Sequence, residues 1–356
     1  FAAPLICGFL GDTGNPQDFK WGFLASGIMT LFTVVLFETQ KNKYLFSPSG
    51  EPIGIVPDAR REKKEDKAEH ISHPKMDKRT KVRNIIIITA LTVDLIAFFS
   101  YAFSDDWISV GIFTACIVFP VLILLDGSLT KVERSRIFVI YIVAFFVIFF
   151  WAAYEQAGAS LTLFASEQTD RSIFGWEMPA SWFQSFNPLF VVILAYIMPG
   201  IWGFLNKRNM EPASPTKQAI GLLLLSLGYL FICFGVKDAI PGVKVSMIWL
   251  TGLYFIHTMG EIALSPIGLS MVNKLSPLRF ASLMMGIWYL STATANKFAG
   301  MLSGLYPEDG KVKSILGYQI ATMYDFFMLF VIMSGVASLI LFLLSKKLQK
   351  MMHGVE

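Results

Sequence analysis

The chain is dominated by long runs of apolar residues that carry almost no charge. About 20 apolar residues in a helix cross the hydrocarbon core of a bilayer, because each residue adds about 1.5 Å of length. Hydrophobic residues make up 54% of the 356 residues and charged residues only 16%, which excludes a soluble domain of this size. We therefore predict an all-α polytopic membrane protein. Its nine predicted spans lie near residues 21–38, 84–103, 108–125, 137–165, 185–205, 218–236, 246–273, 280–304 and 322–345.

A tenth apolar stretch, FAAPLICGFL at residues 1–10, is too short to cross a bilayer. It lacks the basic segment and the cleavage site of a signal peptide. We interpret it as the end of a helix whose beginning lies outside the chain. On this interpretation, the chain is expected to be the C-terminal portion of a longer protein.

Lysine and arginine are distributed unevenly between the two sets of predicted connections. Cytoplasmic loops of membrane proteins are enriched in these residues. One set holds 23 of them and comprises residues 41–83, 127–136, 206–217, 274–279 and 346–356. The other set holds 6 and comprises residues 11–20, 104–107, 166–184, 237–244 and 305–321. We therefore place the first set, and with it the C-terminus, in the cytoplasm.

The longest predicted connection, residues 39–83, mixes charges of both signs with few apolar residues. That composition is typical of a flexible linker. His70 and His73 within it are expected to be solvated rather than to bind a metal, because no cysteine accompanies them. The net charge of +4 comes from the cytoplasmic connections and gives no reason to expect nucleic-acid binding.

Motifs of enzymes and of nucleotide-driven pumps are absent from the sequence. It contains no dinucleotide fingerprint, P-loop, HExxH or GxSxG motif. Cys7, Cys116 and Cys233 lie in or beside apolar segments without CxxC spacing, so we expect packed, unpaired thiols. We therefore expect no catalytic residue, no metal and no cofactor. If the protein moves a solute, the driving force would be a gradient, or an ATPase on another chain.

Two acidic residues lie alone inside membrane-length apolar runs. No charged residue occurs in residues 137–154 before Glu155, or in residues 245–260 and 262–273 around Glu261. A carboxylate at bilayer depth costs on the order of 3 kcal/mol or more, so such residues usually face a bundle interior or a water-filled path. An acid in that environment can take up and release a proton near neutral pH. The two acids therefore indicate proton-coupled transport.

The segment around Glu155 reads FFWAAYEQAGASLTLFA over residues 149–165. Helical spacing places Trp151, Tyr154 and Glu155 on one broad face, with Gln156 beside it. Aromatic walls with a few polar groups are typical of small-molecule sites, which makes these residues candidates for binding. The alternative is an aromatic packing face with one structural acid.

The segment around Glu261 reads HTMGEIALSPIGLS over residues 257–270. Two glycines and Pro266 can weaken or bend a helix there, and Ser265 lies one turn beyond the acid. Bent helices with small residues are common where transport helices move. Alternatively, Glu261 is a buried hydrogen-bond anchor. His257 either modulates the protonation of Glu261 or packs in the core.

Four further residues each have two interpretations. Asn187, directly before Pro188, either caps a helix or reaches a ligand carbonyl. Trp288 either lines a cavity or packs against its neighbours. Lys297 either snorkels to water or forms the salt bridge of a gate. Asp94 lies about 16 Å into its predicted span, where an acid is either functional or incidental.

Several of these motifs together carry a resemblance to a known family. They are FFWAAYEQAGASLTLFA, FQSFNPLFVVILA, and GEIALSPIGLSMVNKLSP with the following GIWYLSTATANKFAG. With the opening APLICGFLGD and WGFLASGIMT, they resemble the proton-dependent oligopeptide transporter family of the major facilitator superfamily. The resemblance extends over most of the chain outside residues 39–83.

The resemblance implies the domain organisation of a bacterial, inner-membrane member of that family. Residues 1–38 resemble the end of the N-terminal bundle, with a partial fifth helix and the sixth, and residues 39–83 a cytoplasmic linker. Residues 84–126 resemble the transmembrane hairpin that bacterial members insert between their two bundles. Residues 127–345 resemble the complete C-terminal six-helix bundle, and residues 346–356 a cytoplasmic tail.

The resemblance also implies an activity and roles for single residues. Members of the family import di- and tripeptides with protons by alternating access between two bundles. By position, Glu155 resembles the acid linked to proton coupling, and Glu261 the acid that holds the amino terminus of the peptide. Asn187 resembles an amide near the same end of the ligand, and Trp288 and Ser265 resemble pocket positions. Peptides, protons, the bilayer and the missing N-terminal bundle are the implied partners.

Other functions stay open at this point. The same fold carries other small solutes, such as drugs, nitrate or amino acids, and competition by unlabelled dipeptides would separate these cargoes. A channel or a polytopic receptor is a different class. Counterflow would identify a carrier, because a pore does not concentrate label against an opposing substrate gradient. Asp94 is expected to have no direct role, since the family's inserted hairpin lies outside the transport path.

Overall fold

The computed structural model describes residues 2–13, 15–46, 77–103, 106–237, 243–308 and 311–355. Most of the predicted linker 39–83, with His70 and His73, lies outside these ranges. The described residues are mostly helical, and their strands form three two-stranded sheets. They group into two compact units, one of Phe1–Ser72 with Arg171–Pro188 and one of His73–Asp170 with Leu189–Glu356.

The first unit is built on two helices, α1 (Ala2–Gly11) and α2 (Phe19–Tyr44). A Cβ added to Gly22 of α2 would lie 2.9 Å from the carbonyl oxygen of Cys7, so the two backbones are in direct contact. Small residues permit such close approach between membrane helices. The short elements of this unit are η1 (Pro16–Asp18), β2 (Ser172–Ile173), β3 (Trp176–Glu177) and η3 (Ala180–Ser185).

The second unit contains the C-terminal helices and a separate helical hairpin. Its long helices are α4 (Lys78–Phe103), α5 (Trp107–Leu124), α6 (Lys131–Tyr154), α8 (Phe186–Lys207, from Leu189 onwards), α9 (Ser214–Val236), α10 (Met247–Leu275), α11 (Ala281–Ser303) and α12 (Met323–Met351). Its short elements are η2 (Glu155–Gly158), α7 (Ser160–Glu167), η4 (Leu278–Phe280), the parallel pair β1 (Thr169–Asp170) and β4 (Val245–Ser246), and the antiparallel pair β5 (Lys313–Ile315) and β6 (Tyr318–Ile320).

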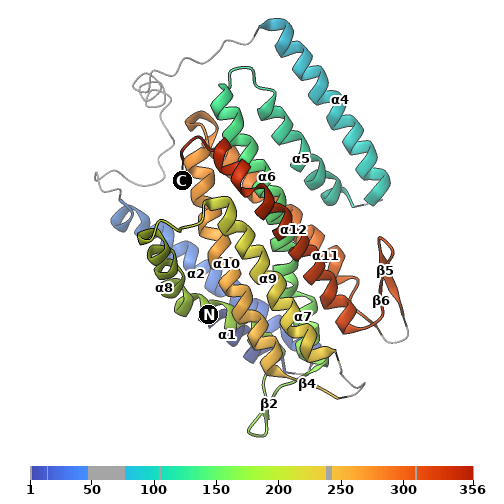
Figure 1. Ribbon diagram of the computed structural model, residues 1–356. Coiled ribbons are helices and arrows are strands. Elements are labelled where there is room, and N and C mark those ends of the chain that lie inside the picture. Colours follow the sequence, from blue (N-terminus) through green and yellow to red (C-terminus); the bar gives the residue numbers. More distant parts are fainter. Residues whose placement is uncertain are drawn as a thin grey trace. The chain divides into compact units, whose positions relative to one another are not determined.

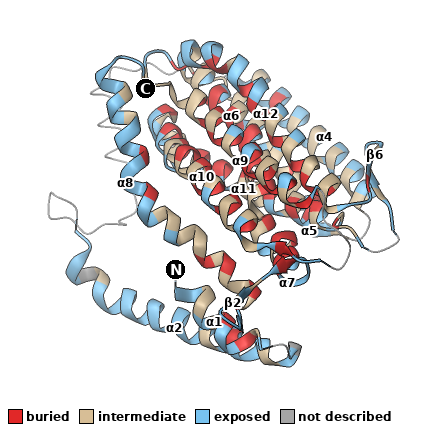
Figure 2. Cartoon of the chain, turned by 60° about the horizontal axis from the view of Figure 1, so that its bottom comes forward, coloured by how far each residue is buried: buried red, intermediate tan, exposed pale blue. Residues whose placement is uncertain are grey.

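The core of the second unit lies between α6, α9, α10 and α12. Helix α9 packs along both α10 and α12, and α11 packs along α6 (Figure 1). Tyr229 of α9 is fully buried and stacks on Phe330 of α12, with 4.8 Å between the ring centroids. Figure 2 shows buried residues concentrated on these helices. Exposed positions are often apolar as well, as at Leu343 and Ile248, which is typical of a surface that contacts lipid.

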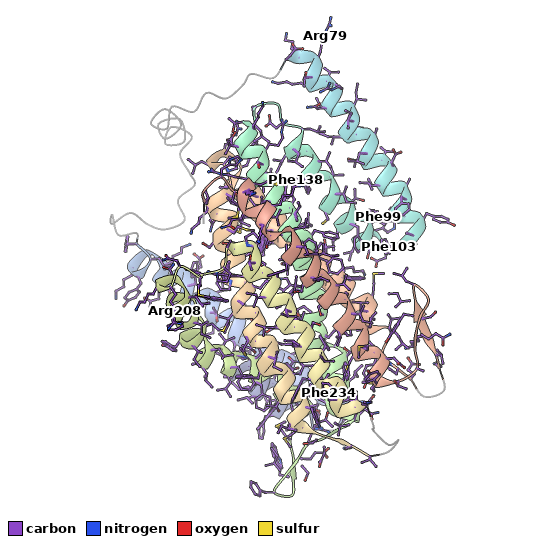
Figure 3. The ribbon with its side chains drawn as sticks, in the orientation of Figure 1. Arg79, Phe99, Phe103, Phe138, Arg208 and Phe234 are labelled. Atoms are coloured by element: carbon purple, nitrogen blue, oxygen red, sulfur yellow. The ribbon has the colours of Figure 1, made fainter. Side chains whose placement is uncertain are left out.

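Helices α4 and α5 form the hairpin, whose predicted counterpart is residues 84–126. Phe103 of α4 stacks on Phe113 of α5, with 5.0 Å between the ring centroids, and Phe99 lies beside both rings (Figure 3). At the other end of the hairpin, Asn84 Nδ2 donates to the Leu125 carbonyl oxygen at 2.6 Å. Contacts at both ends therefore hold the two helices together.

Among the described residues, eight helical segments are long and apolar enough to cross a membrane, and they match eight of the nine predicted spans. The ninth, residues 280–304, is present as helix α11 but is not one of the eight. Polar residues in its second half, including Thr292, Asn296 and Lys297, reduce its apolar character. The protein is therefore a multi-pass membrane protein, with one helix more polar than we expected.

One predicted span differs from a regular helix. Residues 137–165 were expected to form one continuous helix, but α6 ends at Tyr154 and a 3₁₀ turn, η2, follows it. Helix α7 then begins at Ser160. The turn contains Gly158, a residue that weakens helices, and the Thr162 hydroxyl donates to the Ala157 carbonyl oxygen at 2.7 Å. The helix is therefore interrupted at Glu155.

Candidate functional site

The interruption at Glu155 frees backbone groups that a continuous helix would satisfy. The last carbonyls of a helix have no partner within it. Here the Tyr229 hydroxyl of α9 donates to the Ala153 carbonyl oxygen at 2.7 Å, and Gln156 Nε2 donates to the Ala152 carbonyl oxygen at 3.2 Å. Side chains therefore replace the missing backbone bonds, and the interruption is a built part of the fold.

Tyr154 and Glu261 join α6 to α10. The Tyr154 hydroxyl donates a hydrogen bond of 2.5 Å to Glu261 Oε2, and both side chains are half-buried. Hydrogen bonds to an ionised carboxylate are shorter and stronger than bonds between neutral groups. The Tyr154 ring is fixed in turn by stacking on Phe150 and by an edge contact with Trp151. The aromatic face predicted from the sequence therefore orients the donor to Glu261.

Glu155 follows Tyr154 directly and is also half-buried. Tyr154 in turn donates to Glu261, so Glu155 lies one residue from that hydrogen bond. The structure therefore brings Tyr154 and Glu261 into contact, with Glu155 next to them in the chain at the helix interruption.

Gln156, which we predicted to bind substrate, is hydrogen-bonded to other parts of the chain. It is fully buried, and its Nε2 donates to the Ala299 carbonyl oxygen of α11 at 3.0 Å. Its Oε1 accepts a bond of 2.6 Å from the Ser160 hydroxyl. Both ends of the amide are therefore occupied within the chain, and Gln156 fastens the helix interruption to α11.

Helix α10 carries Glu261 at a point of close contact with α9. A Cβ added to Gly260 would lie 2.8 Å from the Gly221 carbonyl oxygen, so the two backbones touch next to the acid. Pro266 lies within α10, which nevertheless continues as one helix to Leu275. Ser265, one turn beyond Glu261, is half-buried.

Trp288 and His257 are packed side chains in this structure. Trp288 is 4% exposed and its ring lies against Gly268 of α10, where an added Cβ would meet it. His257 is 2% exposed and lies between the Tyr229 and Tyr154 rings, at 4.7 Å and 6.2 Å between centroids. Both side chains are packed here, and the roles of Trp288 in a pocket and of His257 beside Glu261 stay predictions.

Asn187 belongs to the first structural unit, whereas Glu155 and Glu261 belong to the second. Helix α8 begins at Phe186, so Asn187 lies in its first turn rather than before it. Both interpretations of Asn187, as a helix cap and as a ligand amide, stay predictions.

Lys297 does not snorkel freely to water. Its Nζ lies 2.5 Å from Asp106 Oδ2, at the start of α5 in the hairpin. Asp106 was missed from the sequence, although it is an acid in a short connection opposite the one lysine of a predicted span. Asp94 lies on α4 of the hairpin and is exposed, and its expected lack of a direct role stays a prediction.

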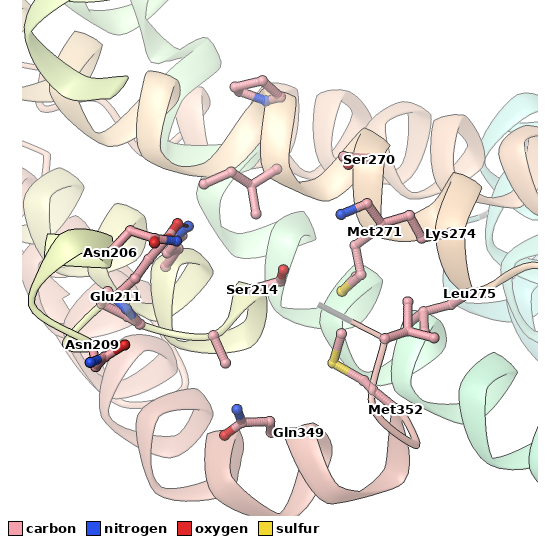
Figure 4. Close-up of a pocket in the computed structure, with 16 residues that line it drawn as sticks. Asn206, Asn209, Glu211, Ser214, Ser270, Met271, Lys274, Leu275, Gln349 and Met352 are labelled. Carbon is pink, nitrogen blue, oxygen red and sulfur yellow. Dashed lines mark hydrogen bonds and ion pairs between the residues drawn. The ribbon is translucent and has the colours of Figure 1, made fainter. Parts of the chain in front are cut away.

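A cavity of about 680 Å³ lies elsewhere, at the ends of α8, α9, α10 and α12 (Figure 4). Lys217 and Asn206 on its wall donate to Glu211 and hold the pKa of that carboxyl below its ordinary value. Helix α10 contributes six of its lining residues, from Pro266 to Leu275, and all of them follow Glu261 in the chain. None of the predicted site residues is among the residues that line it.

Among the described residues, no group of three or more His, Cys, Asp or Glu side chains is placed to hold a metal ion. The structure is that of a polytopic helical protein in which the membrane helix α6 is interrupted at an acid, Glu155. Secondary transporters use such interrupted helices for their substrate and ion sites. The arrangement is thus that of a transporter.

Comparisons with known proteins agree with this class. The family model PTR2, described as the POT family, matches residues 1–316. The peptide transporter YePEPT of Yersinia enterocolitica is 29% identical over 314 residues, covering 85% of this chain and 58% of the relative. The uncharacterized transporter YclF of Bacillus subtilis is 30% identical over 358 residues, covering 99% of this chain and 65% of the relative. The chain belongs to the POT family.

Solved structures give the same result. A crystal structure of the peptide transporter POT in complex with sulfate matches with a TM-score of 0.72 and 27% identity, covering 99% of this chain and 66% of that one. A POT family transporter in complex with 5-aminolevulinic acid matches with a TM-score of 0.67 and 26% identity, covering 97% and 66%. The fold is therefore that of the POT transporters, and the chain spans less than two thirds of the length of the two relatives named above.

Proposed function

We propose that the complete gene product is a proton-coupled symporter that imports di- and tripeptides by alternating access. The hydrogen bond from Tyr154 to Glu261, beside Glu155 at the helix interruption, is the observation that carries this proposal. Through this bond Glu261 contacts the residue that directly precedes Glu155, within the membrane-spanning part of the chain. The names of several relatives, including the di-/tripeptide transporter of Lactococcus lactis, support peptides as the cargo.

In this proposal Glu261 binds the ammonium group of the peptide. A carboxylate has two oxygens that each accept more than one hydrogen bond, so the ammonium group and the Tyr154 hydroxyl can share Glu261. Since Tyr154 directly precedes the interruption, peptide binding at Glu261 acts on the contact between α6 and α10 next to Glu155.

Glu155 is the proposed proton-coupling residue. A neutral carboxylic acid and a carboxylate differ in the partners that they attract, so protonation changes which contacts hold the interrupted helix. The interruption itself is secured by side-chain hydrogen bonds rather than by a continuous helix. We propose that this local arrangement allows access to alternate without unfolding α6. Asn187, Ser265 and Trp288 stay proposed substrate contacts for a conformation in which they reach the ligand.

The membrane setting completes the proposal. The charge distribution of the loops supports a cytoplasmic C-terminus, and bacterial relatives support the inner membrane. The proposed driving force is the proton gradient, with no cofactor and no catalytic reaction. Peptides, protons and the lipid bilayer are the proposed partners.

A second candidate cargo is a small solute other than a peptide. One similar structure contains 5-aminolevulinic acid, which carries an amine and a carboxylate but no peptide bond. Glu261 would bind the amine of such a solute as readily as that of a peptide. The two cargoes differ in length and in their side chains, so competition distinguishes them.

The test is uptake of a labelled dipeptide into proteoliposomes that contain the complete gene product. We expect an inward proton gradient to increase uptake, and unlabelled di- and tripeptides with many side chains to compete. Competition by 5-aminolevulinic acid alone would instead identify the small solute as cargo. Absence of gradient-dependent uptake of either compound by folded protein would contradict the proposed symport.

A further inference from the structure

Helix α11 is fastened to the hairpin at one end by Lys297. The Nζ of Lys297 lies 2.5 Å from Asp106 Oδ2, and both side chains are about one-third exposed, at 33% and 36%. Asp106 is also the N-cap of α5, because its Oδ1 accepts from the Ser109 backbone N–H at 3.1 Å. The carboxylate therefore fixes the start of α5 and the position of Lys297 at the same time.

Asp106 keeps its charge in the range in which a proton-coupled carrier works. The hydrogen bonds from Lys297 and Ser109 lower the pKa of Asp106 from 3.8 to about 2. Because the folded value lies below the ordinary one, the stabilisation is complete above pH 3.8 and is lost as the pH falls through about 2. The Asp106 carboxylate is therefore available to Lys297 throughout that range.

The other end of α11 is fastened as well. Arg279 lies in η4, directly before the helix, and its Nη1 and Nη2 donate to the hydroxyl and carbonyl oxygens of Ser128 at 3.1 Å each. Ser128 lies in the connection that joins the hairpin to α6. Arg279 and Lys297 are about 27 Å apart along the helix axis, close to the thickness of the hydrocarbon core of a bilayer. Arg279 also pairs with Glu133 of α6, at 3.5 Å between Nη2 and Oε2. Lys297 thus fastens α11 to the hairpin, and Arg279 fastens the other end to the start of α6 and the connection before it.

The end of α11 that carries Lys297 also contacts the helix interruption. Ala299, two residues after Lys297, accepts the hydrogen bond of Gln156 through its carbonyl oxygen. Gln156 is fully buried and directly follows Glu155. A continuous series of contacts therefore runs from Asp106 to Lys297, along α11 to Ala299, and from there to the turn that contains Glu155.

We propose that Lys297 and Asp106 are positioning residues, through which the hairpin holds the helix interruption at Glu155 in place. The hairpin then acts as a brace for α11, and Lys297 is an anchor rather than a gate. The importance of this positioning for transport rests on the proposed function of Glu155. The positioning itself is independent of the cargo.

The test uses Lys297→Met, Asp106→Asn and the double variant in the complete gene product. Asparagine is also a good N-cap, so Asp106→Asn removes the charge pair with little disturbance of α5. Hydrogen exchange of a peptide covering residues 153–162 reports on the interruption. We expect each single change to increase exchange roughly two- to fivefold, the range for a partly exposed ion pair. The double variant should not exceed the larger single effect, because both changes remove one contact.

Two control variants and one transport assay separate positioning from a general loss of stability. Lys297→Arg should restore the exchange rate of the wild type, because it keeps the charge. Lys311→Met breaks an exposed pair with Glu308 in a loop and should leave residues 153–162 unchanged. In the vesicle assay, Lys297→Met should lower gradient-driven uptake more than counterflow.

Unchanged exchange in a folded Lys297→Met protein would overturn the proposal, and so would effects of the two single changes that multiply in the double variant. Increased exchange in a protein whose wild type transports no peptide would support the positioning and refute the proposed function. The two failures are therefore distinguishable.

Discussion

Tyr154 is the residue whose role the structure changes most. The sequence placed it on an aromatic face near Glu155, whereas the structure shows its hydroxyl bound to Glu261 on a different helix. Residues 107 positions apart cannot be paired from helical spacing, which relates only neighbours three or four residues apart. The candidate residues were therefore predictable from the sequence, but this contact between them was not.

Replacement of Tyr154 by phenylalanine tests this contact. The change removes one hydroxyl and with it the hydrogen bond to Glu261 Oε2, so we expect a loss of about 1.5–3 kcal/mol of stability, the range for a hydrogen bond to a charged group. Tyr141→Phe is the matched control, because the Tyr141 hydroxyl donates only to the Met284 sulfur, at 3.6 Å. Thermal unfolding in detergent should show a clearly lower midpoint for Tyr154→Phe. Equal midpoints for the two variants would show that the bond to Glu261 does not stabilise the fold.

Gln156 and Lys297 also show, for single residues, what the sequence could not predict. Both are polar residues in apolar segments, and such residues often serve function. In the structure, Gln156 bonds to the Ala299 carbonyl oxygen and Lys297 pairs with Asp106. Their partners come from other elements, so the sequence alone could not distinguish a ligand contact from a structural one.

At the scale of the elements, the helices were predictable, because an uncharged apolar run long enough to cross a bilayer folds as a helix. Eight helical segments of the described residues match predicted spans, and each begins or ends within a few residues of a charged or turn-forming position. The interruption of α6 was not predicted, because residues 155–158 fit a helical pattern as well as their neighbours do. Its stability comes from hydrogen bonds of Tyr229 and Gln156 that form only in the folded bundle.

The crossing of α9 and α10 at Gly221 and Gly260 yields a prediction at this scale. An alanine at position 260 would place its Cβ 2.8 Å from the Gly221 carbonyl oxygen, a backbone atom that cannot move aside. We expect Gly260→Ala to cost about 1–3 kcal/mol, as overpacking of a core does. The measurement is again the unfolding midpoint in detergent.

Gly286→Ala provides the control for this prediction. Gly286 lies within α11, and an added Cβ there meets nothing within 4 Å. Alanine is the better helix former, so Gly286→Ala should be neutral or stabilising by up to about 1 kcal/mol. If Gly260→Ala were equally harmless, the two helices would not be in backbone contact beside Glu261.

At the scale of the whole molecule, the fold class and the family were predictable from short motifs and from the apolar pattern. The POT family model then matched residues 1–316, and solved POT structures share the fold. The roles of the site residues stay predictions, because they depend on a ligand and on a conformational cycle. The anchoring of the hairpin was not predictable either, since it rests on the pairs of Lys297 and Arg279 with residues distant in sequence.

The central claim is that Glu155 couples protons to transport while Glu261 binds the substrate. The most direct test compares Glu155→Gln with Glu261→Gln in proteoliposomes, measuring gradient-driven dipeptide uptake and dipeptide counterflow on the same preparations. Asp94→Asn, at an exposed acid of the hairpin, is the control and should behave as the wild type does. We predict that Glu155→Gln loses driven uptake but retains counterflow. Glu261→Gln should lose both by roughly tenfold or more, as expected when a charged contact to the ligand is removed. Driven uptake that survives unchanged in Glu155→Gln would contradict the account.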